Sequence, residues 1–184
     1  LTWAEQGYPC KEYPAVAEIL EFAKSQDGQL HYLRKPQFRA IETYFYVRCV
    51  LETPKVVDLY DKVSPSRSEF YKTLGIDAGQ AEISSMLLDG IDILEKARTD
   101  DNFAKKHRLD ALRESLALNY PSYILALTMG AGKTVLIGSI ISMEFSLSLE
   151  YPNENFMKNA LVFAPGTTII ESLRELSDIP FERL

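Results

Sequence analysis

The sequence has few residues of the kinds that build metal or disulfide frameworks, and it has no long apolar run. Its 184 residues include 2 cysteines and 2 histidines. Cys10 and Cys49 are far apart, and His31 and His107 stand alone, so neither a zinc site nor a disulfide framework is indicated. No stretch reaches the roughly eighteen apolar residues that a membrane span requires. We therefore expect a cytoplasmic protein without a membrane segment.

Basic residues are also in short supply. The chain has 20 Lys and Arg residues against 26 Asp and Glu residues, for a formal net charge of −6. This balance argues against nucleic-acid binding through bulk charge, so any DNA contact must be local. The two basic clusters, at 105–108 and 34–39, are more typical of solvated helix faces than of DNA-binding patches.

The most informative stretch is Ala-Leu-Thr-Met-Gly-Ala-Gly-Lys-Thr at 126–134. Gly130 and Gly132 allow the backbone to turn sharply and to approach an anion closely. An apolar run at 122–127 predicts a buried strand before the loop, and 135–145 predicts an apolar helix after it. The order strand, loop, helix predicts a phosphate site in which Lys133 reaches the β/γ-phosphates and Thr134 binds Mg²⁺. The predicted nucleotide-binding residues of this loop are Thr128, Met129, Gly130, Ala131, Gly132, Lys133 and Thr134.

A second block covers 159–176, which reads as a five-residue apolar strand, a Pro-Gly turn and an amphipathic helix. Small residues and hydroxyls in this turn suit a close approach to phosphate. The alternative is a plain turn in which Thr167 or Thr168 caps the next helix. The residues of the turn are Pro165, Gly166, Thr167 and Thr168.

A third block lies upstream, at 32–42, and contains Arg34 and Gln37. The amide of Gln37 presents a donor and an acceptor together, which suits the adenine edge, and Tyr32 or Leu33 is placed to cover the ring. The alternative is the start of an amphipathic helix with Pro36 in its first turn.

These three blocks resemble, in order, the glutamine motif, motif I and motif Ia of superfamily 2 helicases and translocases. Leu127 stands where the general phosphate-loop pattern has glycine, and motif I of this superfamily commonly lacks that glycine. The resemblance is to DEAD/DEAH-type proteins and to the restriction subunit of type III restriction enzymes. It implies ATP and Mg²⁺ at the loop, adenine at Arg34 and Gln37, and the sugar-phosphate backbone of single- or double-stranded DNA at 165–168.

The expected fold class is α/β, with a partial RecA-like P-loop core of parallel strands and flanking helices. Roughly ninety residues separate Gln37 from the phosphate loop, and their periodicity predicts a large helical insertion. Breaks are expected at 53–54, 64–66, Gly75 and 100–102. The expected organisation is an N-terminal helical segment at 1–30, a glutamine-motif helix at 31–51, the insertion at 52–118, and the truncated start of the first motor lobe at 119–184.

The expected function is that of a fragment of an ATP-dependent DNA helicase or translocase from a restriction-type enzyme. The parent protein would hydrolyse ATP, with an endonuclease domain and a modification or specificity subunit as expected partners. An Asp-Glu pair after an apolar strand is missing from these residues, so we expect the fragment to bind ATP and Mg²⁺ without hydrolysis. The alternative is a nucleotide-binding scaffold or protein-docking module without motor activity.

Overall fold

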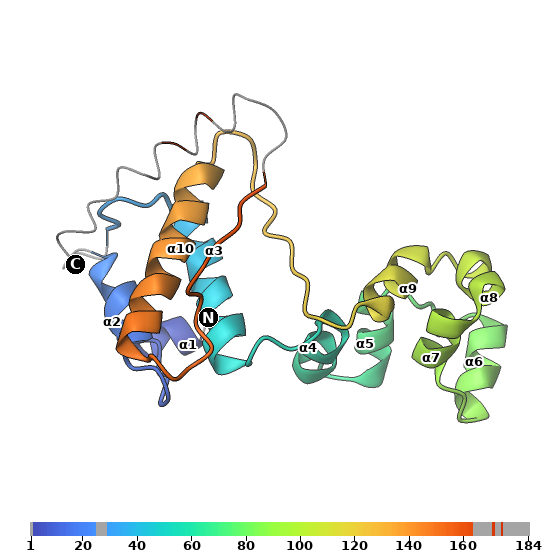
Figure 1. Ribbon diagram of the computed structural model, residues 1–184. Coiled ribbons are helices and arrows are strands. Elements are labelled where there is room, and N and C mark those ends of the chain that lie inside the picture. Colours follow the sequence, from blue (N-terminus) through green and yellow to red (C-terminus); the bar gives the residue numbers. More distant parts are fainter. Residues whose placement is uncertain (1, 25–28, 164–170, 172–173, 175–184) are drawn as a thin grey trace. The chain divides into compact units, whose positions relative to one another are not determined.

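The structure is a computed structural model that describes residues 2–24, 29–163, 171 and 174. The chain divides into two compact units, drawn in Figure 1. Unit 1 consists of Leu1–Val50 and Leu125–Leu184, and unit 2 of Leu51–Ile124. The insertion predicted at 52–118 lies within unit 2. Glu52 and Thr53, just after the first boundary, both have positive φ.

Unit 1 is built from helices near both ends of the chain. They are α1 (Thr2–Glu5), α2 (Ala15–Phe22), α3 (Lys35–Phe45), the π-helix η1 (Tyr46–Val50) and α10 (Lys133–Glu150). Helix α3 follows an extended N-cap residue, Arg34, and has Pro36 in its first turn, as the sequence predicts. Phe38, Ile41 and Phe45 recur at helical spacing, so α3 buries one face.

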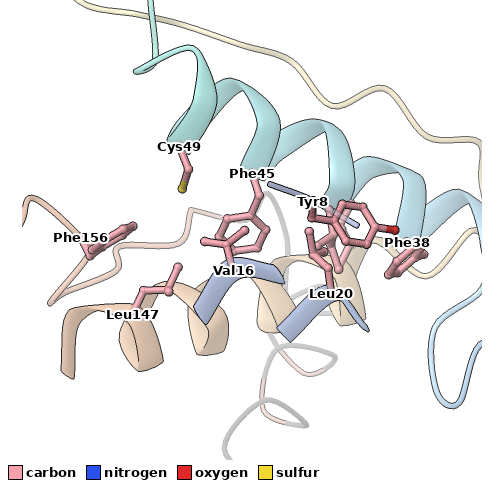
Figure 2. Packing of buried hydrophobic residues seen from close by; sticks show 10 residues of the cluster. Tyr8, Val16, Leu20, Phe38, Phe45, Cys49, Leu147 and Phe156 are labelled. Atoms are coloured by element: carbon pink, nitrogen blue, oxygen red, sulfur yellow. The ribbon is translucent and has the colours of Figure 1, made fainter. Parts of the chain in front are cut away.

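The core of unit 1 lies between α2, α3 and α10. Figure 2 shows Val16 of α2, Phe45 of α3 and Leu147 of α10 directed toward one another. Each of these three side chains is fully buried. Burial of one such side chain stabilises a fold by about 1.5–3 kcal/mol. These contacts therefore hold Val16 and Phe45 against Leu147, which lies more than a hundred positions later in the sequence.

A buried carboxylate also ties α10 into this unit. Glu144 is only 1% exposed. Its carboxylate accepts hydrogen bonds from the Tyr44 hydroxyl at 2.9 Å, from Arg48 Nε at 3.2 Å and from the Met157 backbone N–H at 2.9 Å. A buried charge requires such partners, so Glu144 fixes α10 against α3, η1 and the chain that follows α10.

Unit 2 consists of six short helices. They are α4 (Val56–Val63), α5 (Arg67–Thr73), α6 (Ala81–Leu88), α7 (Ile93–Thr99), α8 (Asp101–Lys106) and α9 (Asp110–Ala117). Side-chain caps define three starts: Ser66 accepts from the Glu69 N–H, Asp92 from two N–H groups of α7, and Asp100 from the Phe103 N–H. A second apolar cluster, which includes Ile83, Ile93 and Phe103, packs α5, α6, α7, α8 and α9 together.

The predicted breaks at 64–66, Gly75 and 100–102 are confirmed, because a helix ends or begins at each. Two further breaks were not predicted. Gly90, with φ of 73°, separates α6 from α7 inside the stretch 78–97, whose apolar and acidic residues at helical spacing predict one continuous helix. Arg108, with φ of 58°, separates α8 from α9 inside the stretch 103–118.

The predicted α/β class is wrong for the part of the chain that the structure describes. Those residues are helical, and their only β pairing is an isolated bridge between Lys24 and Leu30. The expected strands at 122–127 and 159–163 pair with no neighbour there, and Ile124 and Phe163 are 91% and 85% exposed. A parallel strand needs a hydrogen-bonded partner and cover on both faces, which an apolar run by itself does not provide. The partial RecA-like core of parallel strands is therefore not observed.

Helix α10 is the longest described helix, with 18 residues. It begins at Lys133, where the sequence predicts a helix start. None of the helices in the described ranges combines the length and the apolar character required to cross a membrane.

Candidate phosphate-binding loop

The glycine-rich loop forms a tight bend directly before α10. The backbone N–H of Ala131 donates to the carbonyl of Thr128 at 3.3 Å. Gly130 and Gly132 have φ of 74° and 77°, the left-handed region that disfavours residues with a Cβ atom. The two glycines that the phosphate-loop pattern singles out therefore both adopt backbone conformations that favour glycine.

Several backbone N–H groups at the start of α10 have no acceptor among the described residues. The first N–H of α10 to pair with the chain is that of Leu136, which donates to the Gly132 carbonyl at 3.1 Å. Within the described ranges, no acceptor pairs with the N–H groups of Gly132, Lys133 and Thr134. They lie at the positive end of the α10 dipole, so donors and field both favour an anion at this point.

Two functional side chains predicted from the motif flank these donors. Lys133 is exposed, and its Nζ atom donates to the Thr128 carbonyl at 3.2 Å, across the bend. Thr134 is half-buried in the first turn of α10. An exposed ammonium and a hydroxyl beside free N–H groups fit a polyphosphate carrying a divalent cation. Of the other loop residues, Met129 is 94% exposed and Ala131 is buried.

Two side chains of the block at 32–42 form hydrogen bonds with this loop. Arg34 donates from Nη1 to the Gly130 carbonyl at 2.9 Å, and Gln37 donates from Nε2 to the Gly132 carbonyl at 2.9 Å. These pairs are separated by 96 and 95 residues in sequence. The structure thus brings together the two blocks that the sequence predicts to share one site.

Tyr32 and Leu33 line a cavity of about 510 Å³ between α2 and α10. The Tyr32 ring is 86% exposed, and Ser139 and Met143 form the α10 side of the cavity. The walls are mainly apolar, which suits the face of a ring. Leu33 in its wall directly precedes Arg34, and Ser139 in its wall lies less than two turns beyond Lys133 along α10.

The predicted DNA-contact residues are not among those that the structure describes. Pro165, Gly166, Thr167 and Thr168 all lie outside the described residues. The basic cluster at 105–108 is locally paired: Lys105 contacts Asp101 at 2.7 Å, and Lys106 contacts Glu82 at 2.5 Å. This pairing fits a solvated helix face.

Two features of the site region were not predicted from sequence. One is the contact between Gln37 and Gly132, for which no local pattern exists. The other is the buried Glu144 network, for which a signal was present: Glu144 is the only charged residue in the apolar stretch 135–149. A lone carboxylate in such a stretch indicates burial with partners.

No protein-family profile matches the sequence, and comparisons with curated proteins and with solved structures give no significant match.

Proposed function

We propose that this chain binds ATP with Mg²⁺ through Thr128–Thr134 and that it belongs to an ATP-dependent DNA helicase or translocase of the restriction type. The observation that carries the proposal is the set of N–H groups at Gly132, Lys133 and Thr134, which have no acceptor among the described residues and lie at the start of an 18-residue helix. The phosphate-binding part of the proposal depends on this loop and helix.

The backbone of the loop and the side chains of Lys133 and Thr134 have different parts in binding. The N–H groups donate to phosphate oxygens, and their geometry depends on the left-handed backbone at Gly130 and Gly132. Lys133 leaves the Thr128 carbonyl and places its charge on the terminal phosphates, where an ion pair replaces a weaker bond to a neutral oxygen. The Thr134 hydroxyl supplies one oxygen ligand to Mg²⁺, and the phosphates supply others.

The base belongs, on this proposal, in the cavity beside Tyr32 and Leu33. Both residues precede Arg34, which contacts the loop directly, so base and triphosphate would occupy adjoining parts of unit 1. An exposed tyrosine ring and an apolar wall favour a flat aromatic ligand.

The DNA and partner assignments rest on the motif resemblance. They include contacts of 165–168 with the DNA backbone and association with a modification or specificity subunit. If the loop serves only as a scaffold, nucleotide binding persists while no DNA-dependent activity is linked to it.

The test is nucleotide binding by isothermal titration calorimetry with Mg²⁺ATP. Lys133→Ala should weaken binding by at least roughly tenfold, because it removes a charged hydrogen-bond donor to phosphate. The matched control is Lys62→Ala, an exposed lysine of unit 2, which should leave affinity unchanged. Absence of binding to the unmodified chain, or equal binding by Lys133→Ala, would overturn the assignment.

A second measurement separates motor from scaffold. In the intact parent protein, Lys133→Ala should abolish ATP-dependent activity on DNA if the loop drives a motor. If the loop serves a docking module, the same substitution should leave partner binding unchanged and reveal no ATP-dependent step. The chain itself should bind ATP without steady-state turnover.

A further inference from the structure

The side-chain amide of Gln37 is engaged at both ends by backbone. Its Oε1 accepts from the Arg34 backbone N–H at 2.7 Å, and its Nε2 donates to the Gly132 carbonyl at 2.9 Å. The partners fix the orientation of the amide, because an N–H can only donate and a carbonyl can only accept. The amide thus joins the N-cap residue of α3 to the N-cap residue of α10.

Little of this side chain is accessible to a ligand. Gln37 is 3% exposed. Hydrogen-bonding a purine edge requires the amide to present a donor and an acceptor side by side, and here both ends point into the protein. Turning the amide toward a base would leave the Arg34 N–H and the Gly132 carbonyl each without one partner, at a cost in free energy.

The contact with Gly132 is close as well as polar. A Cβ atom on Gly132 would lie 2.3 Å from Gln37 Nε2, far inside van der Waals contact. The carbonyl of Gly132 accepts both from Nε2 and from the first paired N–H of α10, that of Leu136. The Gln37 amide therefore fixes Gly132, and the backbone of Gly132 sets the direction of the Lys133 and Thr134 N–H groups.

Arg34 acts on the other glycine. Its Nη1 binds the Gly130 carbonyl at 2.9 Å, so side chains from one short segment hold two carbonyls of the loop. With those carbonyls occupied, the N–H groups of Gly132, Lys133 and Thr134, which have no acceptor among the described residues, remain available to a ligand.

We propose that Gln37 is a positioning residue that fixes the phosphate loop and that it does not select the base. This inference rests on the proposed nucleotide binding and revises the part that Gln37 plays in it. Base contacts then come from the apolar cavity wall at Tyr32 and Leu33, which offers surface to any purine ring. Loss of Gln37 lowers the affinity of the loop for the triphosphate itself.

The test compares three ligands on the unmodified chain and on Gln37→Met, which keeps the length of the side chain and removes its hydrogen bonds. Calorimetric affinities are measured for ATP, GTP and inorganic tripolyphosphate, each with Mg²⁺. All three should fall by the same factor, roughly five- to tenfold, with the ATP-to-GTP ratio unchanged. Weaker ATP binding with intact GTP and tripolyphosphate binding overturns the proposal. Gln6→Met, at an exposed position, is the matched control.

A second readout does not depend on any ligand. Hydrogen exchange of the two paired amides beside the contact should speed up in Gln37→Met and stay unchanged in Gln6→Met. These are the Ala131 N–H, which donates to the Thr128 carbonyl, and the Leu136 N–H, which donates to the Gly132 carbonyl. Unchanged exchange in the Gln37 variant overturns the positioning role even if nucleotide binds. Conversely, failure of the unmodified chain to bind all three ligands ends the nucleotide proposal, while the exchange data still decide the role of Gln37. If Gln37→Met does not fold, Gln37→Glu, which keeps the acceptor and loses the donor, carries both measurements.

Discussion

The two loop glycines provide a direct test of the geometry around Gln37. Gly130 and Gly132 have nearly the same φ, 74° and 77°. Their surroundings differ, because a Cβ atom on Gly130 meets no atom within 4 Å and one on Gly132 lies 2.3 Å from Gln37 Nε2. Replacing each glycine by alanine imposes a similar backbone penalty, while only Gly132→Ala displaces the buried amide.

The expected magnitudes follow from this difference. An alanine in the left-handed region costs about 1–2 kcal/mol, which is the full effect expected for Gly130→Ala. Gly132→Ala adds the loss of the Gln37 hydrogen bond and the exposure of its partners, a further ~1–3 kcal/mol. Gly90→Ala in unit 2, with φ of 73° and no neighbour within 4 Å, should match Gly130→Ala in cost.

The assay is urea unfolding of the glycine variants of unit 1, followed by the fluorescence of the single tryptophan. Trp3 reports on unit 1, because it packs edge-on against Tyr8 at 5.0 Å and against Tyr46 at 5.3 Å. Gly90→Ala lies in unit 2 and is followed by circular dichroism, which avoids treating two units as one transition.

A double-mutant cycle isolates the contact. In a Gln37→Ala background, Gly132→Ala should cost no more than Gly130→Ala, because the clashing amide is gone. The contact between Gln37 and Gly132 is refuted if Gly132→Ala and Gly130→Ala lower the free energy of unfolding of the unmodified chain by the same amount. It is also refuted if the excess cost survives removal of Gln37.

Three further predictions concern the core of unit 1. Glu144→Leu should lower the free energy of unfolding by about 3–5 kcal/mol, because it strands buried donors, whereas Glu150→Leu at the exposed end of α10 should change it by less than about 0.5 kcal/mol. Iodoacetamide should alkylate the partly exposed Cys10 of the native chain well before Cys49, and mass spectrometry of peptides follows both reactions. Cys49 reacts slowly because burial raises the pKa of its thiol to about 12. Burial and the Glu144 carboxylate raise the pKa of the Tyr44 hydroxyl above its ordinary value of 10. The unfolded chain therefore loses this proton at a lower pH than the folded chain, and the free energy of unfolding should fall as the pH rises above 10. Tyr44→Phe should make this pH dependence less steep.

Each of these has a contradicting outcome. Equal losses for Glu144→Leu and Glu150→Leu would show that the buried network is not formed. Comparable alkylation of both cysteines before unfolding would place Cys49 at the surface. A pH profile that is the same with and without the Tyr44 hydroxyl would contradict the coupling of that hydroxyl to Glu144.

Helices were the predictable part of this fold. The periodicity of 14–24, the predicted helix start at Arg34 with Pro36 in its first turn, and the turn residues at 64–66 locate α2, α3 and the break between α4 and α5. Amphipathic spacing and helix breakers are local properties. The start of α10 at Lys133 was predictable for the same reason. The breaks at Gly90 and Arg108 were missed because a single residue of positive φ leaves the apolar spacing almost undisturbed.

That the described residues form no sheet was not predictable from the apolar runs. The stretches at 122–127 and 159–163 have strand-like composition, but a strand is defined by the neighbour to which it bonds, and composition does not name that neighbour. The candidate site shows the same limit. Its loop glycines and lysine follow from a local motif, whereas the pairing of Gln37 with Gly132 joins residues 95 positions apart and depends on the packing of α3 against α10.

The Glu144 network makes α10 a rigid connection between two distant stretches of chain. Lys133 opens the helix, and Glu144, eleven residues later and about 16 Å along the axis, holds the backbone N–H of Met157. Phe156, beside it, is anchored in the same core. A tilt of α10 at its glycine end is thus transmitted to 156–157, so a spectroscopic label near Met157 can report events at the loop without touching it.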